Sequence, residues 1–226
     1  MPVGDRDYAL TIGIPVPMRD GAELLTDLYT PVGDPLGTIL VRTPYGRDGP
    51  VAFLTARLYA LHGYRVVHQA CRGTDGSGGT FEPFRHEISD GADTVAWLRR
   101  QPWFDGRFAV CGPSYLGYTA WAVMVDPPPE LATAVIAVTG HDNHQLTHGS
   151  GAVGLEQLLR LMHAFAHLDD GLLPSLLRLV AAGPRLARGR RQLPLVRALD
   201  TALAGTGMPY RSWLTTRDAE APFWAP

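Results

Sequence analysis

Short apolar runs alternate with helix-spaced apolar patterns from residue 38 to residue 138, and this alternation limits the possible folds more than any other feature of the sequence. Before them, two extended segments joined by the turn signal Asp20-Gly21 predict a β-hairpin. The predicted strands cover residues 8–17, 22–29, 38–42, 64–70, 108–111 and 132–138, and the predicted helices cover residues 51–62, 90–101 and 115–125. Strands that alternate with helices imply a mostly parallel sheet with right-handed crossovers and helices on both faces. The sequence therefore predicts an α/β fold.

The organisation of the chain changes near residue 144, where the strand signal stops. Leucine- and arginine-rich helical patterns continue to about residue 204, and the irregular segment WLTTRDAEAPFWAP follows them. We therefore expect two domains, a core over residues 1–143 and a helical cap with a terminal irregular segment over residues 144–226.

Charge and composition exclude several classes of function. A net charge of −2 and a pI near 6.4 lack the basic bias that binding to a phosphate backbone needs, so nucleic acid is not expected as a partner. No apolar run approaches the roughly 18 residues that span a bilayer, and the first residues lack the pattern of a signal peptide. Cys71 and Cys111 end predicted strands and are expected to be buried thiols. These features predict a soluble cytoplasmic protein with no membrane partner.

The segment FAVCGPSYLG joins a predicted strand to a predicted helix at Ser114. In a nucleophile elbow, a serine occupies a strained strand-to-helix turn, and small residues are needed where the backbones crowd together. Gly112 and Gly117 supply them, although Leu116 stands where the G-x-S-x-G motif has its second glycine. This geometry would direct the backbone N–H of Tyr115 at a developing oxyanion. The pattern predicts acyl transfer by a serine nucleophile, and the alternative is a serine that caps the helix.

Five stretches of the chain carry a resemblance to a known family. In family order they are PVPMRDGAELLTDLYTP, VRTPYGR, GYRVVHQACRGTDGSGGTFEPF, DGADTVAWLRRQPWFDGR and GPSYLGYTAW. Through them, the chain resembles the cocaine esterase-like and X-Pro dipeptidyl-peptidase-like hydrolases (CocE/NonD, peptidase S15), which are α/β-hydrolases. The resemblance implies that Ser114 is the nucleophile, that the backbone N–H of Tyr115 is one oxyanion donor, and that the Tyr45 hydroxyl is the other. A neutral phenol suits this role, and the alternative is that Tyr45 only packs on the sheet.

The same resemblance has implications for the rest of the chain. It identifies the helical stretch with the cap that such enzymes insert before their last sheet strands. Family members then continue with a strand bearing the catalytic Asp, another bearing the catalytic His, and a C-terminal β-sandwich, none of which lies within these 226 residues. Because a serine hydroxyl needs a base, we expect a hydrolase of small-molecule esters or amides whose activity is impaired. The alternative is a non-catalytic remnant that binds a small apolar ligand or a partner.

Polar residues after the last predicted strand could replace the absent acid and base. Asp142 and His141 or His144 would lie at the same edge of the sheet as Ser114. Nothing in the sequence fixes their geometry, however, and ordinary polar residues at the end of a strand are the simpler interpretation.

Metal and cofactor sites have little support in the sequence. Histidines at helical spacing occur at His141, His144, His148, His163 and His167. There is no H-E-x-x-H motif, and the Gly-rich loop at residues 72–79 lacks the G-K-[ST] of a phosphate-binding loop. We therefore expect neither a metal nor another cofactor.

The strand at residues 132–138 is the last one predicted, so it leaves an unpaired edge of the sheet. An open edge predicts a tendency to form a homodimer or to aggregate.

Overall fold

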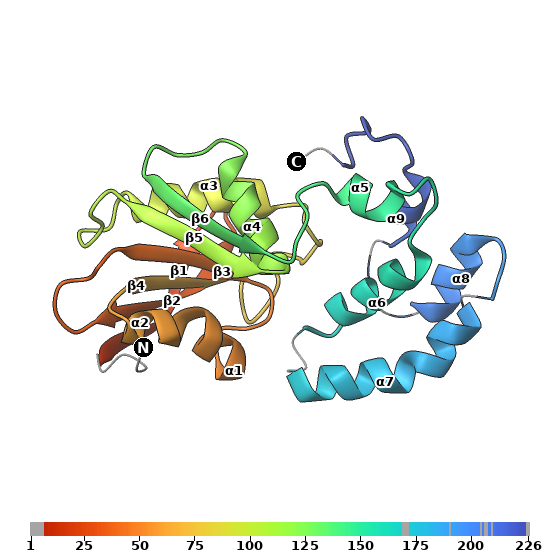
Figure 1. Cartoon of the computed structure of the whole chain (residues 1–226), viewed down its shortest axis with the longest axis horizontal. Helices are drawn as coiled ribbons and strands as arrows, with labels where there is room; N and C mark the ends of the chain where they lie inside the picture. The colour runs from red at the N-terminus through yellow and green to blue at the C-terminus, as the bar shows by residue number, and fades with distance from the viewer. Residues whose placement is uncertain are drawn as a thin grey trace. The chain divides into compact units, whose positions relative to one another are not determined.

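The computed structural model describes residues 7–168, 172–189, 191–203, 205, 208 and 210–224 (Figure 1). The chain divides into two compact units, Met1–His141 and Asp142–Pro226. Among the described residues, the first unit contains all the strands and the second contains helices and loops. The boundary expected from the sequence lies after residue 143.

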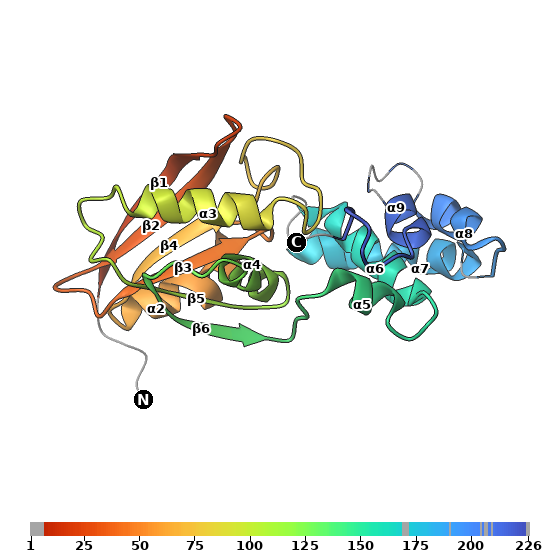
Figure 2. The same ribbon diagram turned by 90° about the horizontal axis from the view of Figure 1, so that it is seen from above.

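The N-terminal unit is built on one sheet, whose described strands follow the order β1-β2-β4-β3-β5-β6 (Figure 2). β1 pairs with β2, and β2 with β4, in antiparallel register, whereas β4, β3, β5 and β6 run parallel to one another. The strands are β1 (Tyr8–Pro17), β2 (Glu23–Pro31), β3 (Thr38–Thr43), β4 (Arg65–Ala70), β5 (Phe108–Pro113) and β6 (Leu131–Ala137). This topology confirms the predicted hairpin and the mostly parallel α/β sheet.

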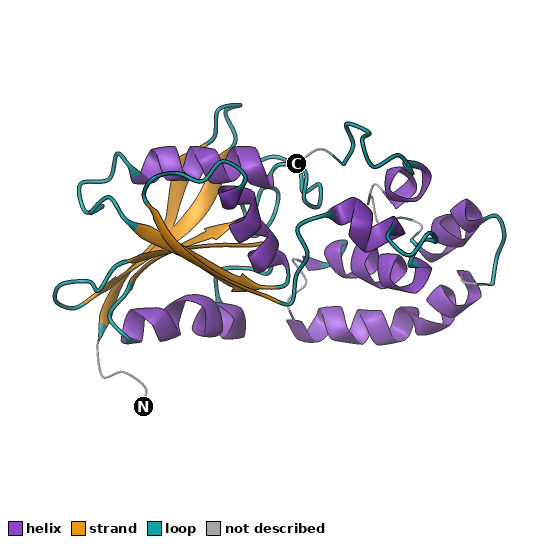
Figure 3. Cartoon of the chain, turned by 45° about the horizontal axis from the view of Figure 1, so that its top comes forward, coloured by secondary structure: helices purple, strands orange, loops and turns teal. Residues whose placement is uncertain are grey.

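Helices cover both faces of this sheet (Figure 3). The helical segments are α1 (Gly49–Ala52), the π-helical turn η1 (Phe53–Arg57), α2 (Leu58–Leu61), α3 (Glu87–Leu98) and α4 (Tyr115–Met124). Because side chains alternate along a strand, Leu40 of β3 packs in a cluster with residues of α3 and α4. Its neighbours Ile39 and Val41 pack in a second cluster with Ala56 and Ala60. The central strand is thus buried on both faces, as all six residues of β3 show.

The loops that follow β3 and β5 lie at the same edge of the sheet. β3 and β5 are parallel neighbours, so the loop after Thr43 and the turn after Pro113 both leave the sheet at its carboxyl edge. Ligand sites of open α/β sheets are formed at this edge. The fold therefore brings together residues that are about seventy positions apart in sequence, such as Tyr45 and Ser114.

The C-terminal unit contains the described helices α5 (Asn143–His148), α6 (Leu155–Phe165), α7 (Leu172–Gly189), α8 (Leu195–Ala202) and α9 (Tyr210–Thr215). α6 and α8 are amphipathic, and each buries one apolar face, with Leu159 and Leu199 almost fully enclosed. Within the described ranges, every helix is too short or too polar to cross a lipid bilayer.

Candidate active site

Ser114 lies in the turn between β5 and α4, in a strained backbone conformation. Its φ of 55° and ψ of −127° are values that residues other than glycine rarely adopt. The Ser114 N–H donates a 3.0 Å hydrogen bond to the carbonyl of Ala137, which ties the turn to the end of β6. The Ser114 side chain makes no capping hydrogen bond to α4, and the residue is exposed. The helix-cap alternative therefore does not explain this serine, whereas the strain and exposure match an elbow.

Gly112 and Gly117 are needed because the backbones on the two sides of Ser114 come very close together. A Cβ atom on Gly112 would lie 2.2 Å from the Cβ of Leu116. A Cβ atom on Gly117 would lie 2.5 Å from Cγ2 of Thr139 and 2.9 Å from the carbonyl oxygen of Gly112. These distances are far shorter than van der Waals contact, so any larger residue would open the turn. Gly117 thus provides the second small position that the departure at residue 116 left in question.

Tyr45 reaches this turn from the loop that follows β3. Its hydroxyl lies 3.3 Å from Oγ of Ser114, and its ring packs against the apolar cluster on the α2 face of the sheet. Burial raises the pKa of Tyr45, and the Ser114 hydroxyl and the backbone N–H of Tyr115 offset only part of this rise. The phenol therefore remains protonated at neutral pH and can donate a hydrogen bond. The structure brings all three predicted site residues together, and Tyr45 both packs on the sheet and contacts Ser114.

The side chain of Tyr115 points away from the solvent and into a polar interior. It is 2% exposed, and its hydroxyl donates to Oε1 of Glu87 over 2.8 Å. The same hydroxyl oxygen accepts a 2.9 Å hydrogen bond from the backbone N–H of Phe84, whose ring stacks on that of Tyr115 with centroids 4.7 Å apart. Burial, and then the negative charge of Glu87, raise the pKa of Tyr115 well above its ordinary value.

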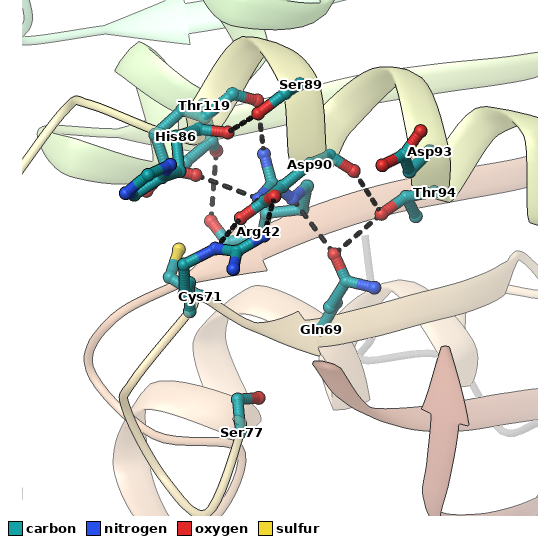
Figure 4. A network of polar contacts seen from close by, with 12 residues as sticks. Arg42, Gln69, Cys71, Ser77, His86, Ser89, Asp90, Asp93, Thr94 and Thr119 are labelled. Atoms are coloured by element: carbon teal, nitrogen blue, oxygen red, sulfur yellow. Dashed lines mark hydrogen bonds and ion pairs between the residues drawn. The ribbon is translucent and has the colours of Figure 1, made fainter. Parts of the chain in front are cut away.

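Arg42, Gln69 and Asp90 belong to a network of buried polar contacts (Figure 4). Glu87 joins this network through Arg42. Nη2 of Arg42 lies 2.9 Å from Oε2 of Glu87, and both side chains are at most 3% exposed. Arg42 also donates from Nη1 to the backbone carbonyl of Glu87 over 2.8 Å, and from Nε to Oε1 of Gln69 over 2.9 Å. Asp90 extends the network to Arg72 through contacts of 2.6 and 3.1 Å. Burial lowers the pKa of Arg42, but the neighbouring carboxylates outweigh it and leave that pKa raised.

The family model of the X-Pro dipeptidyl-peptidase (S15 family) matches residues 20–226, which is most of the chain. The chain belongs to this family. Cocaine esterase from Rhodococcus sp. (strain MB1 Bresler) is 35% identical over 162 residues, which are 69% of this chain and 28% of that relative. This S15-family chain therefore spans about a quarter of the length of that curated relative.

Solved structures agree with the observed architecture. The crystal structure of an aminopeptidase from the marine sediment archaeon Thaumarchaeota archaeon matches with a TM-score of 0.55 and 26% identity, over 73% of this chain and 31% of the other. An esterase of Pyrococcus furiosus matches with a TM-score of 0.50 and 20% identity, over 65% of this chain and 54% of the other, and shows the fold alone. The S15-family chain thus has the α/β-hydrolase fold that the sequence predicts.

The polar residues after β6 do not serve Ser114 within the N-terminal unit. His141 packs against Trp121, with ring centroids 5.4 Å apart. Among the described residues of this unit, no histidine or carboxylate is hydrogen-bonded to Oγ of Ser114, whose partner is Tyr45. A second histidine of this unit, His68, is fully buried, and its Nε2 lies within hydrogen-bonding distance of Oγ1 of Thr55. Neither histidine has the geometry of a general base.

The histidines of the C-terminal unit contact other groups of the same unit. Asp142 caps α5 by accepting from the backbone N–H of Gln145 over 2.8 Å. Nε2 of His144 donates to the carbonyl of Arg217, and Nε2 of His148 to the carbonyl of Trp213, each over 2.9 Å. His163 and His167 lie with ring centroids 4.8 Å apart. No group of three or more potential ligands is placed to hold a metal ion in the part of the chain that the structure describes.

Sequence reasoning did not identify Glu87 or Arg42 as parts of this site. Glu87 precedes the predicted start of its helix at residue 90, and Arg42 ends a predicted strand. Charged residues in such positions are usually solvated. The available signal was the arginine at the carboxyl end of a strand, since that edge is where ligand sites are formed.

Proposed function

We propose that this chain carries the acyl-transfer site of a serine hydrolase that acts on small-molecule esters or amides, with Ser114 as the nucleophile. One observation carries the proposal. The exposed Ser114 has a strained backbone, and its hydroxyl lies beside the protonated phenol of Tyr45. Ser114 also precedes the N-terminus of α4, where the backbone N–H of Tyr115 is close enough to Tyr45 to affect the pKa of Tyr45. A nucleophile between two donors is the arrangement that acyl transfer requires.

The reaction begins with attack of Oγ of Ser114 on the substrate carbonyl carbon. The carbonyl π electrons move to the oxygen, and the Tyr45 hydroxyl and the Tyr115 N–H stabilise the resulting negative charge. Collapse of this intermediate expels an alcohol or amine and leaves an acyl group on Ser114. Water then attacks the acyl-enzyme, and the acid is released.

Ser114 needs a base to accept its proton, and the leaving group needs an acid to supply one. We assign the nucleophile and the oxyanion donors to the N-terminal unit, and the acid–base pair to another part of the protein. In this assignment, the helical C-terminal unit is the cap of the enzyme. The relatives support the reaction type, because an esterase and an aminopeptidase both transfer an acyl group from an alcohol or amine to water.

Covalent labelling by a fluorophosphonate tests this proposal directly. The purified chain is incubated with the probe, and mass spectrometry locates the adduct. We expect slow phosphonylation at Ser114, with fluoride as the leaving group, because the oxyanion donors act here without the base. No adduct should form in Ser114→Ala. Ser89→Ala is the matched control, because it removes a hydroxyl from α3 that donates to the backbone carbonyl of His86.

Tyr45→Phe tests the role of the oxyanion donor while the nucleophile stays in place. It should slow labelling by about 10²-fold or more, as the loss of one oxyanion donor does in other serine hydrolases. Equal labelling of wild type and Ser114→Ala would overturn the proposal. Binding of small apolar ligands without any labelling would favour the non-catalytic alternative.

A further inference from the structure

The phenol of Tyr115 has no part in the reaction described above, yet it is one of the most firmly held side chains near the site. The backbone N–H of Tyr115 is the proposed donor, whereas its side chain is buried in the interior beside Glu87. Its hydroxyl both donates to Glu87 and accepts from the N–H of Phe84. A buried tyrosine needs only one partner, so the double restraint calls for an explanation.

Glu87 connects this phenol to three parts of the sheet unit. Oε1 of Glu87 accepts from Tyr115 of α4, while Oε2 pairs with Arg42 at the end of β3. Arg42 in turn is fixed by Gln69 of β4 and by the backbone carbonyl of Glu87 at the start of α3. The position of the Tyr115 ring is therefore set by α3, β3 and β4 together.

Stability alone does not account for such an arrangement. A buried ion pair loses about as much hydration energy as it recovers, so an apolar pair of similar volume is often as stable or more stable. What the network can give the site instead is a fixed position of the oxyanion donor. The oxyanion donor must lie within about 2.7–3.1 Å of an oxygen that forms only during the reaction, and displacements of about 1 Å can cost 10²-fold in rate.

The strain at Ser114 makes this support necessary. The backbone at Ser114 has a φ of 55°, and relaxation of the turn would rotate the next peptide, which carries the Tyr115 N–H. A side chain anchored one residue beyond the strained position opposes that rotation.

We propose that Glu87 is a positioning residue: by fixing the phenol of Tyr115, it keeps the Tyr115 backbone N–H directed at the substrate oxyanion. This inference rests on the acyl-transfer function proposed above and deepens it. Glu87 touches neither the substrate nor the reacting atoms, and it acts through Tyr115.

Phenylboronic acid is a suitable probe, because it measures the oxyanion site without a complete turnover. The oxygen of Ser114 donates an electron pair to boron, the hydroxyl proton passes to solvent, and an anionic tetrahedral boronate forms. This anionic adduct places a boron-bound hydroxyl oxygen where the oxyanion would lie. ¹¹B NMR distinguishes the tetrahedral from the trigonal species, and titration gives the Kd.

The variants are Tyr115→Phe, Glu87→Gln and Glu87→Ala, with Asp93→Asn as the matched control. Asp93 is on the same helix, and its ion pair with Arg19 lies at the surface. We expect Tyr115→Phe to weaken the Kd about tenfold. Glu87→Ala should weaken it at least as much, Glu87→Gln less because its amide oxygen still accepts from the phenol, and Asp93→Asn not at all.

Kd separates positioning from folding, since a smaller folded fraction lowers the amount of adduct but not the midpoint of the titration. A wild-type Kd in Tyr115→Phe would overturn the inference and leave the proposed function standing. Absence of a Ser114-dependent adduct in the wild type would overturn both. If Glu87→Ala does not fold, Tyr115→Phe alone decides, because it removes a single oxygen atom.

Discussion

Among the described residues, the buried ion pairs lie in the sheet unit, whereas the ion pairs of the helical unit are exposed. In the sheet unit, the ion pair between Arg42 and Glu87 is buried, with side chains 1% and 3% exposed. In the helical unit, the pair between Arg160 and Glu156 is open to solvent, at 55% and 46%. The first pair joins β3 to α3 across 45 positions of sequence, and the second joins successive turns of α6.

The difference shows how the elements of each unit are held in position. A buried charge demands a partner in one position, so it fixes the elements that carry the two groups. The helical unit relies instead on apolar contacts such as Leu199 and on rings, with Trp213 and Trp224 only 5.3 Å apart between centroids. Apolar contacts tolerate small shifts. The elements are therefore fixed most strictly in the sheet unit, which carries the proposed acyl-transfer site.

The largest expected effect comes from breaking the buried network. Arg42→Met leaves Glu87 and Asp90 without their shared cation and should destabilise the sheet unit by about 3–5 kcal/mol. Arg160→Met removes an exposed cation from α6 and should cost less than about 0.5 kcal/mol. Urea unfolding, followed by hydrogen exchange of peptides from each unit, measures both.

Equal effects of Arg42→Met and Arg160→Met would remove the contrast between the units. A small effect of Arg42→Met would mean that an apolar side chain satisfies the site as well as the ion pair does, which some buried pairs allow.

A smaller effect is expected from the apolar packing of the helical unit. Leu199 of α8 is fully buried, and Leu199→Ala should destabilise this unit by about 2–4 kcal/mol through lost burial and a residual cavity. Leu177→Ala on α7 is the control, because Leu177 is 62% exposed and should change stability by less than about 0.5 kcal/mol. Amide exchange in α8 should accelerate in the first variant only, and similar exchange in both would show that α8 is not packed as described.

The sequence predicts the sheet well because each strand has its own pattern of apolar residues bounded by turn residues. The hairpin, the central strands and the glycines around Ser114 could all be predicted from neighbouring residues, and the structure shows the close contacts that make Gly112 and Gly117 necessary. Tyr45 required the family resemblance, since the distance of 3.3 Å to Ser114 depends on the parallel pairing of β3 with β5.

The network around Arg42 could not be predicted in this way. Arg42, Gln69, Glu87 and Tyr115 come from four separate elements, and no local pattern marks a charged residue as buried. For the histidines, the predicted shared helix face is confirmed for His144 and His148, whose ring centroids are 5.2 Å apart on α5, but His141 precedes that helix. Spacing does not show that backbone carbonyls already accept their Nε2–H groups, because those carbonyls belong to a distant segment.

The smallest effect concerns a single buried titratable group of the sheet unit. His68 of β4 is fully enclosed, and burial, with a smaller contribution from the charge of Arg47, lowers its pKa from 6.5 to about 3. The unfolded chain binds a proton at this histidine below pH 6.5, whereas the folded chain does not until the pH is near 3. The contribution of neutral His68 to the free energy of unfolding is therefore fully present above the unfolded pKa. It is lost as the pH falls, by at most about 1.4 kcal/mol per pH unit.

His68→Gln tests this linkage, because it removes the titrating group from the same site. Between about pH 6 and 4.5, the free energy of unfolding of the sheet unit should fall less steeply in His68→Gln than in the wild type. Thr55→Val is the matched control, since it removes the hydroxyl that contacts Nε2 but keeps His68 buried, and it should retain the wild-type slope. If His68→Gln had the wild-type slope, the acid sensitivity of this unit would come from its carboxylates instead.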